Sequence, residues 1–89
     1  MAFKRYEVWL EGDDELGLNQ PIAKLWGPAP SLVRAREVAQ ARANATGEHA
    51  LAEGQSVGID EIWYEYVGDI YPEAAYFECF DPPERAESE

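Results

Sequence analysis

The 89-residue chain has one cysteine, one histidine and no long apolar run. A single cysteine, Cys79, forms no internal disulfide, so we expect a cytoplasmic protein. One histidine and one cysteine cannot supply the four ligands of a structural zinc site. The chain has no signal-peptide pattern and nothing near the ~20 apolar residues of a membrane span. We therefore expect no metal and no membrane partner.

Motifs for catalysis or cofactor binding are also lacking. The glycines form neither a dinucleotide-binding motif nor a phosphate-binding loop, and GDDELG at 12–17 lacks the spacing of a calcium loop. His49 has no serine or cysteine at motif spacing, so a hydrolase or ligand-binding protein centred on it is a minor alternative. Cys79 is predicted to be an inert thiol on the core face of a strand. We expect no catalytic residue, no cofactor and no enzymatic activity.

The residue patterns predict one α+β domain over 1–81, followed by a disordered acidic tail at 82–89. The expected order is β-β-α-β-β: an antiparallel four-stranded sheet with one helix packed on one face. We predict strands at 3–11, 22–27, 59–67 and 74–80, a helix at 32–46, a loop with one short helical turn at 48–58, and a turn at 68–73.

The predicted helix has both of its ends marked in the sequence. Ser31 is the expected N-cap, and Gly47 is the expected C′ residue in the left-handed region. The side predicted to face the sheet is rich in alanine and comprises Leu32, Ala35, Val38, Ala39, Ala43 and Thr46. Arg34 and Arg36 lie in the first turns, where the helix dipole disfavours cations. We therefore expect carboxylates from the sheet or a nearby loop to contact them.

Negative charge dominates the composition and gathers at the C-terminal end. The chain has 18 acidic and 7 basic residues, for a net charge of -11. Residues 60–89 hold most of the excess, with Arg85 as their single cation. Such a field repels nucleic acid and attracts basic surfaces. Acidity that merely keeps a small protein in solution is the simpler alternative.

Alternation along the strands predicts that acids and aromatic rings share one face of the sheet. Side chains at i and i+2 point to the same side of a strand. The predicted core side comprises Tyr6, Val8, Leu10, Ile62, Tyr64, Tyr66, Ala75, Phe77 and Cys79. The predicted opposite face comprises Glu7, Trp9, Glu11, Glu61, Trp63, Glu65, Tyr76, Glu78 and Phe80. Lys24 and Trp26 are placed on that second face with them.

This predicted face is suited to binding a protein that handles nucleic acid. Acids at i and i+2 stand about 6.6–6.8 Å apart, close to the spacing of neighbouring phosphates. Tryptophan and tyrosine would add apolar anchors for an interface. The candidate binding residues are Glu7, Trp9, Glu11, Glu61, Trp63, Glu65, Tyr76 and Glu78. A solvated sheet face stabilised by cross-strand aromatic pairs, with no partner, is the alternative.

By type, the chain resembles the small acidic inhibitors carried by phages and mobile elements, including anti-CRISPR proteins. The resemblance lies in size, acidity, the α+β pattern and the acidic-aromatic segments IDEIWYEYV and AAYFECF, and the opening RYEVWLEG is similar to those of small phage proteins. It implies a non-enzymatic protein, possessing no nucleic-acid affinity of its own, that blocks the nucleic-acid-binding surface of a host defence complex. The alternative is a small structural or interaction module that forms a homodimer.

Overall fold

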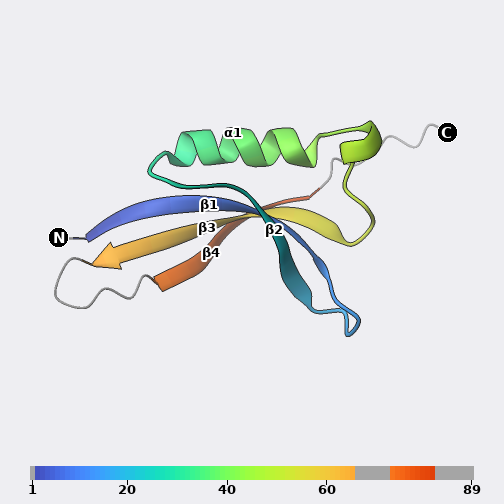
Figure 1. Cartoon of the computed structure of the whole chain (residues 1–89), viewed down its shortest axis with the longest axis horizontal. Helices are drawn as coiled ribbons and strands as arrows, with labels where there is room; N and C mark the ends of the chain where they lie inside the picture. The colour runs from blue at the N-terminus through green and yellow to red at the C-terminus, as the bar shows by residue number, and fades with distance from the viewer. Residues whose placement is uncertain (1, 66–72, 82–89) are drawn as a thin grey trace.

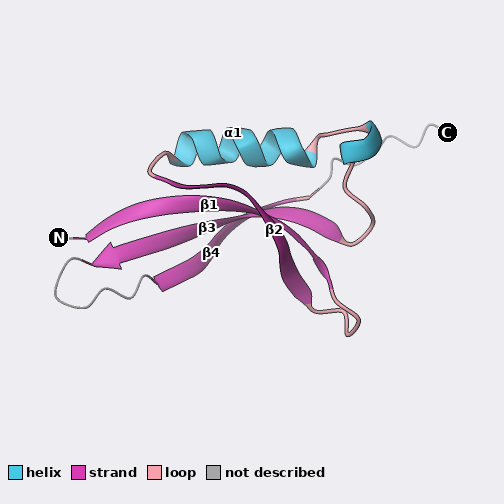
Figure 2. Ribbon diagram, in the orientation of Figure 1, coloured by secondary structure: helices cyan, strands magenta, loops and turns pink. Residues whose placement is uncertain are grey.

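Four strands form one antiparallel sheet, and a single long helix packs on one of its faces (Figure 1). The structure, a computed structural model, describes residues 2–65 and 73–81. The elements are β1 (Ala2–Asp13), β2 (Asn19–Ala29), α1 (Leu32–Ala43), η1 (Gly47–His49), β3 (Gln55–Glu65) and β4 (Glu73–Phe80). The strand order is β2-β1-β3-β4, so β2 and β4 are the edges (Figure 2). The predicted fold class and element order are confirmed.

The core lies between α1 and the two central strands. Tyr6 and Val8 of β1, and Val57 and Ile59 of β3, are buried there against Ala35, Ala39 and Ala43 of the helix. These alanines recur at every fourth position, so they form one stripe along the helix. Their small side chains let the helix backbone lie close to the sheet. The predicted buried side of the helix is confirmed, except that Thr46 is exposed.

The helix begins as predicted and ends earlier than predicted. Ser31 is the N-cap, and its Oγ accepts a hydrogen bond of 3.0 Å from the backbone N–H of Arg34. Asn44 is the C-cap, so Gly47 is not the C′ residue. Gly47 instead opens the short helix η1 with a φ of +67°. The predicted short helical turn in the following segment is η1.

We predict that Arg34→Gln stabilises the protein by about 0.5 kcal/mol, because glutamine at this third helical position completes a capping box with Ser31. The change also removes a cation from the positive end of the helix. It forfeits an exposed ion pair between Arg34 and Glu37, worth only about 0.3 kcal/mol. Urea unfolding followed by circular dichroism measures the gain. Gln40→Ala, in the helix middle, is the control, and an unchanged or lower midpoint for Arg34→Gln would contradict the prediction.

The two strands β2 and β3 are longer than the patterns predict. β2 continues through Pro28 to Ala29, and β3 begins at Gln55 rather than at residue 59. The pairing of β1 with β2 contains three register shifts. One of them separates Lys24, opposite Trp9, from Trp26, opposite Val8, so the prediction that Lys24 and Trp26 share a face is wrong. Trp26 packs against the core.

Some predictions fall outside the described residues. These are the acidic tail at 82–89, most of the turn at 68–73, and the sides of the sheet assigned to the side chains of Tyr64, Glu65, Tyr66, Ala75, Tyr76 and Phe77. Within the described part of the chain, neither helix is long and apolar enough to cross a membrane.

Candidate partner-binding surface

The face of the sheet turned away from α1, here called the open face, carries Glu7, Trp9 and Glu11 of β1. Their neighbours Tyr6 and Val8 point into the core, so alternation places these three on the opposite side. The indole Nε1 of Trp9 donates a hydrogen bond of 3.0 Å to Glu7 Oε1. The Nζ of Lys24 lies 3.5 Å from Glu7 Oε2. These contacts hold the Glu7 carboxylate in one position on the open face.

Glu11 is the most buried acid on this face. Only 6% of its surface is exposed, and its Oε1 accepts a hydrogen bond of 3.1 Å from Asn19 Nδ2. The carboxylate lies over Gly58 of β3: a Cβ at Gly58 would stand 2.7 Å from Glu11 Oε2. A glycine at this position therefore provides the space in which the carboxylate rests.

Asp60 of β3 completes the cluster, and the sequence patterns did not single it out. It pairs with Glu7 across the two central strands. Burial raises the pKa of the Asp60 carboxyl, and the negative charges of Glu11 and Glu7 raise it further. We call Glu7, Trp9, Glu11 and Asp60 the open-face patch. Three of its four residues are carboxylates, so the patch concentrates negative charge on the open face.

We predict that Asp60→Asn stabilises the protein at neutral pH. A carboxyl with a raised pKa in the folded state disfavours folding wherever it is ionised. The penalty is absent below the unfolded pKa, near 4, grows as the pH rises toward the folded pKa, and is complete above it. Urea midpoints should therefore be higher for Asp60→Asn at pH 7 and equal to those of the original protein near pH 3. The exposed Asp13→Asn is the matched control, and an equal gain there, or a gain for Asp60→Asn that persists near pH 3, would contradict this account.

Glu61 and Trp63 do not lie on the open face, so the prediction of one shared acidic-aromatic face is wrong. Glu61 pairs with Tyr6, and Trp63 with Lys4, which places both on the side of the sheet that bears the helix. The physical reason is the longer β3: Val57 and Ile59 supply its core side chains, and alternation from them puts Glu61 and Trp63 on the same side.

The contacts of Glu61 are with its own chain. It accepts hydrogen bonds from the Tyr6 hydroxyl (3.2 Å) and from Trp63 Nε1 (2.8 Å). Lys4 Nζ lies 3.8 Å from Glu61 and 4.3 Å from the centre of the Trp63 ring. The charge of Glu61 is therefore already balanced by Lys4 of the same chain, without a partner. Replacing Glu61 would disturb local structure as well as any interface, so it is a poor probe of binding.

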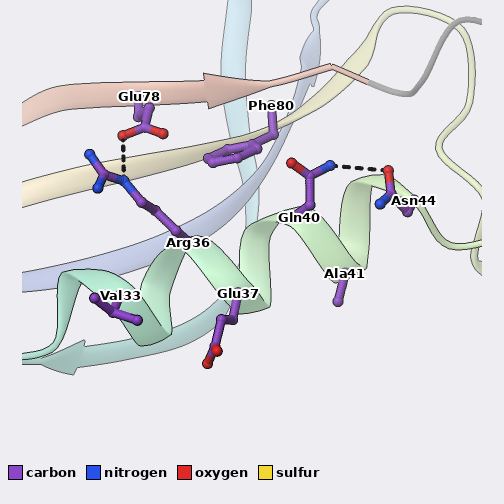
Figure 3. Close-up of a pocket in the computed structure, with 8 residues that line it drawn as sticks. All are labelled: Val33, Arg36, Glu37, Gln40, Ala41, Asn44, Glu78 and Phe80. Carbon is purple, nitrogen blue, oxygen red and sulfur yellow. Dashed lines mark hydrogen bonds and ion pairs between the residues drawn. The ribbon is translucent and has the colours of Figure 1, made fainter.

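Glu78 also faces the helix side, where it meets the expected cation. Arg36 Nε donates a hydrogen bond of 2.9 Å to Glu78 Oε1 (Figure 3). The prediction that a sheet carboxylate contacts an arginine of the first helical turns is thus confirmed for Arg36. Arg34 pairs instead with Glu37 of its own helix.

A register shift between β3 and β4 reverses the predicted sides of the last three residues of β4, Glu78 to Phe80. Phe80 pairs with Val57 and packs against the core, whereas Cys79 pairs with Gly58 and is exposed. The predictions of a buried Cys79 and an outward Phe80 are therefore wrong, because strand alternation does not survive a bulge. The backbones of Glu65 and Tyr76 pair with Ala2 and Asp60. Their side chains lie outside the described part of the structure.

A groove of about 650 Å³ runs between α1 and β4 on the helix side (Figure 3). Val33 and Ala41 line it from the helix, Phe80 lines it from the strand, and the ion pair of Arg36 with Glu78 crosses one end. The groove is mainly apolar and holds no catalytic pair. Over residues 2–65 and 73–81, no group of three histidines, cysteines or carboxylates has the geometry to hold a metal ion.

Comparison of the chain with protein-family models, with curated proteins and with solved structures found no match.

Proposed function

We propose that the protein binds a basic, nucleic-acid-handling protein through the open-face patch and blocks the surface with which that partner holds DNA or RNA. The observation that supports this is the gathering of Glu7, Glu11 and Asp60 on one face of the two central strands. Burial raises the pKa of Asp60, and the two neighbouring carboxylates raise it further. Among the described residues, a single ion pair reaches the patch, that of Lys24 with Glu7. Lysines or arginines of a partner would be attracted to this concentration of negative charge.

The patch also contains an aromatic side chain that can supply apolar contact to a partner. Trp9 lies half-buried between Glu7 and Glu11 and is held by its hydrogen bond to Glu7. A fixed, partly apolar ring beside charged groups is typical of residues that dominate binding energy. The charges would attract and orient a basic partner, and the ring would supply apolar contact. The resemblance to phage-borne inhibitors favours a host defence complex as the partner.

The variant Glu7→Gln/Asp60→Asn tests the proposal. It removes two charges while conserving shape, and Asp60→Asn is itself expected to stabilise the fold. We expect it to weaken binding of the partner at least tenfold, since two charge contacts are lost. The matched control is Glu48→Gln/Glu53→Gln, which removes the same charge from exposed positions outside the patch.

The measurement is a tagged pull-down from host lysate at about 50 mM and about 500 mM salt, followed by binding of the purified captured protein. The proposal predicts capture at low salt of a protein that binds nucleic acid, and release of the captured protein by added DNA or RNA. Equal binding by the patch variant and the control variant would refute the role of the patch. If added DNA or RNA does not release the captured protein, the proposal that the patch blocks its nucleic-acid-binding surface would be refuted.

A further inference from the structure

The tip of the β1–β2 hairpin, residues 13–18, presents leucines to solvent. The exposed fractions are 83% for Leu16 and 56% for Leu18. Three acids, Asp13, Asp14 and Glu15, lie directly beside them in the sequence. The hairpin projects away from the helix layer of its own chain (Figure 1). Neighbouring exposed leucines at the end of a projecting hairpin offer an apolar surface that a second molecule can cover.

The hairpin tip is held in one shape by Asp14. Its Oδ1 accepts hydrogen bonds from the backbone N–H of Leu16 (2.8 Å) and of Leu18 (2.9 Å). The backbone N–H of Asp14 donates to the carbonyl of Leu18, and Gly17 donates to the carbonyl of Asp14. A preorganised turn loses less conformational entropy when it binds. The leucines are therefore offered in a fixed arrangement.

A second groove, of about 520 Å³, runs along α1 toward η1. We call it the α1 groove. Its apolar floor is formed by Val38, Ala41 and Ala45. Its rim carries Arg34, Arg42 and His49, together with Glu37, which pairs with Arg34. An Nη1 hydrogen bond from Arg42 to the His49 carbonyl joins the helix to η1 at one end. The helix carries three arginines against a single acid, Glu37.

The hairpin tip and the α1 groove are complementary in apolar surface and in charge. The tip joins leucines to carboxylates, and the groove joins an apolar floor to a rim on which two arginines outnumber one glutamate. We propose that the chain self-associates through these surfaces, with the hairpin tip of one copy seated in the α1 groove of a second copy. A two-fold arrangement makes this contact twice, once in each direction. The ion contacts at the rim offset part of the repulsion between two chains of charge -11.

This contact is separate from the proposed partner binding, because neither surface includes the open-face patch. The variant Glu7→Gln/Asp60→Asn should therefore leave self-association unchanged, and loss of self-association need not abolish partner binding. The two proposals can fail independently.

Sedimentation velocity of the purified full chain, from about 1 to about 500 µM, tests the inference. The original protein should show a reversible monomer–dimer equilibrium. Leu16→Ser/Leu18→Ser, at exposed positions, should raise the dimer dissociation constant tenfold or more. Arg34→Gln should also weaken the dimer, by about threefold to tenfold, since it removes a rim cation and leaves Glu37 unpaired.

Urea unfolding of the variants shows whether a weaker dimer results from a lost contact or from unfolding of the protein. Arg34→Gln is expected to raise the urea midpoint, so a weaker dimer in that variant cannot result from unfolding. A protein that stays monomeric at the highest concentration would overturn the inference. So would a dimer that neither the tip variant nor Arg34→Gln weakens, since that dimer would use another surface.

Discussion

Gly27→Ala is expected to lower the free energy of unfolding by about 3 kcal/mol or more. Gly27 of β2 has a φ of +96°, a conformation that strains any residue with a side chain. A Cβ at this position would also overlap the carbonyl oxygen of Tyr6 and lie 3.0 Å from the Cα of Glu7. Both obstacles are backbone atoms of the central strand β1, so no side-chain rotation relieves them. A loss of this size is a large share of the ~5–15 kcal/mol that stabilises a typical domain.

Gly17→Ala is the matched control, since it separates strain from close approach. Gly17 has a φ of +80°, but a Cβ there meets nothing within 4 Å. Its cost should therefore be that of backbone strain alone, about 1 kcal/mol. Urea unfolding of both variants, followed by tryptophan fluorescence, measures the difference. Equal losses would mean that β2 does not approach β1 as closely at Gly27 as described.

Elements and their order could be predicted from the sequence because their signals are local. Ser31 before an alanine-rich periodic segment marks a helix start, and alternating aromatic and β-branched residues mark strands. These signals depend on neighbours within a few residues. The first strand, the helix start and the buried alanine stripe were all predicted correctly for this reason. A carboxylate partner was also expected for Arg36, but Glu78, which supplies it, was predicted on the opposite face.

The faces of the strands could not be predicted, because they depend on pairing between distant residues. A strand with apolar residues on both sides, such as Ile59 and Ile62, leaves the inward side ambiguous. The start of β3 at Gln55 decides which side faces inward, because Val57 and Ile59 then both point into the core. Gly58 gave no apolar signal, although its missing side chain makes room for Glu11. A single wrong choice of side moved Glu61 and Trp63 to the wrong face.

Three of the eight predicted binding residues, Glu7, Trp9 and Glu11, lie on the open face. Glu7 and Trp9 are partly exposed there, and Asp60 joins them. Glu61 is engaged by a tyrosine, a tryptophan and a lysine of its own chain. Among the described residues, Glu61 and Glu78 each pair with a cation of the chain, whereas Glu7, Glu11 and Asp60 share one ion pair, that of Glu7 with Lys24. Charge counting cannot separate the two groups, because compensation depends on which residues the register brings together.

Ile59→Ala is expected to cost about 3–4 kcal/mol, because Ile59 is fully buried between β1 and the alanine stripe of α1. The helix contributes mainly small side chains to this core, so few neighbours can move inward to fill the cavity. Within the described residues, Ile59 is among the three largest side chains that are fully buried. Removing it weakens the contact of the helix with the sheet directly.

Two other isoleucines turn this variant into a test of the strand register. Ile62 lies on the other side of β3 with 6% of its surface exposed, and Ile22 of β2 is 54% exposed. We expect a loss of about 2 kcal/mol for Ile62→Ala and less than about 0.5 kcal/mol for Ile22→Ala. Hydrogen exchange of the α1 amides should accelerate in Ile59→Ala more than in a variant of equal stability at Ile62, since only Ile59 contacts the helix. Faster exchange in the Ile62 variant than in Ile59→Ala would mean that Ile62, not Ile59, lies beneath the helix. Glu61 and Trp63 would then lie on the open face, with the proposed binding patch.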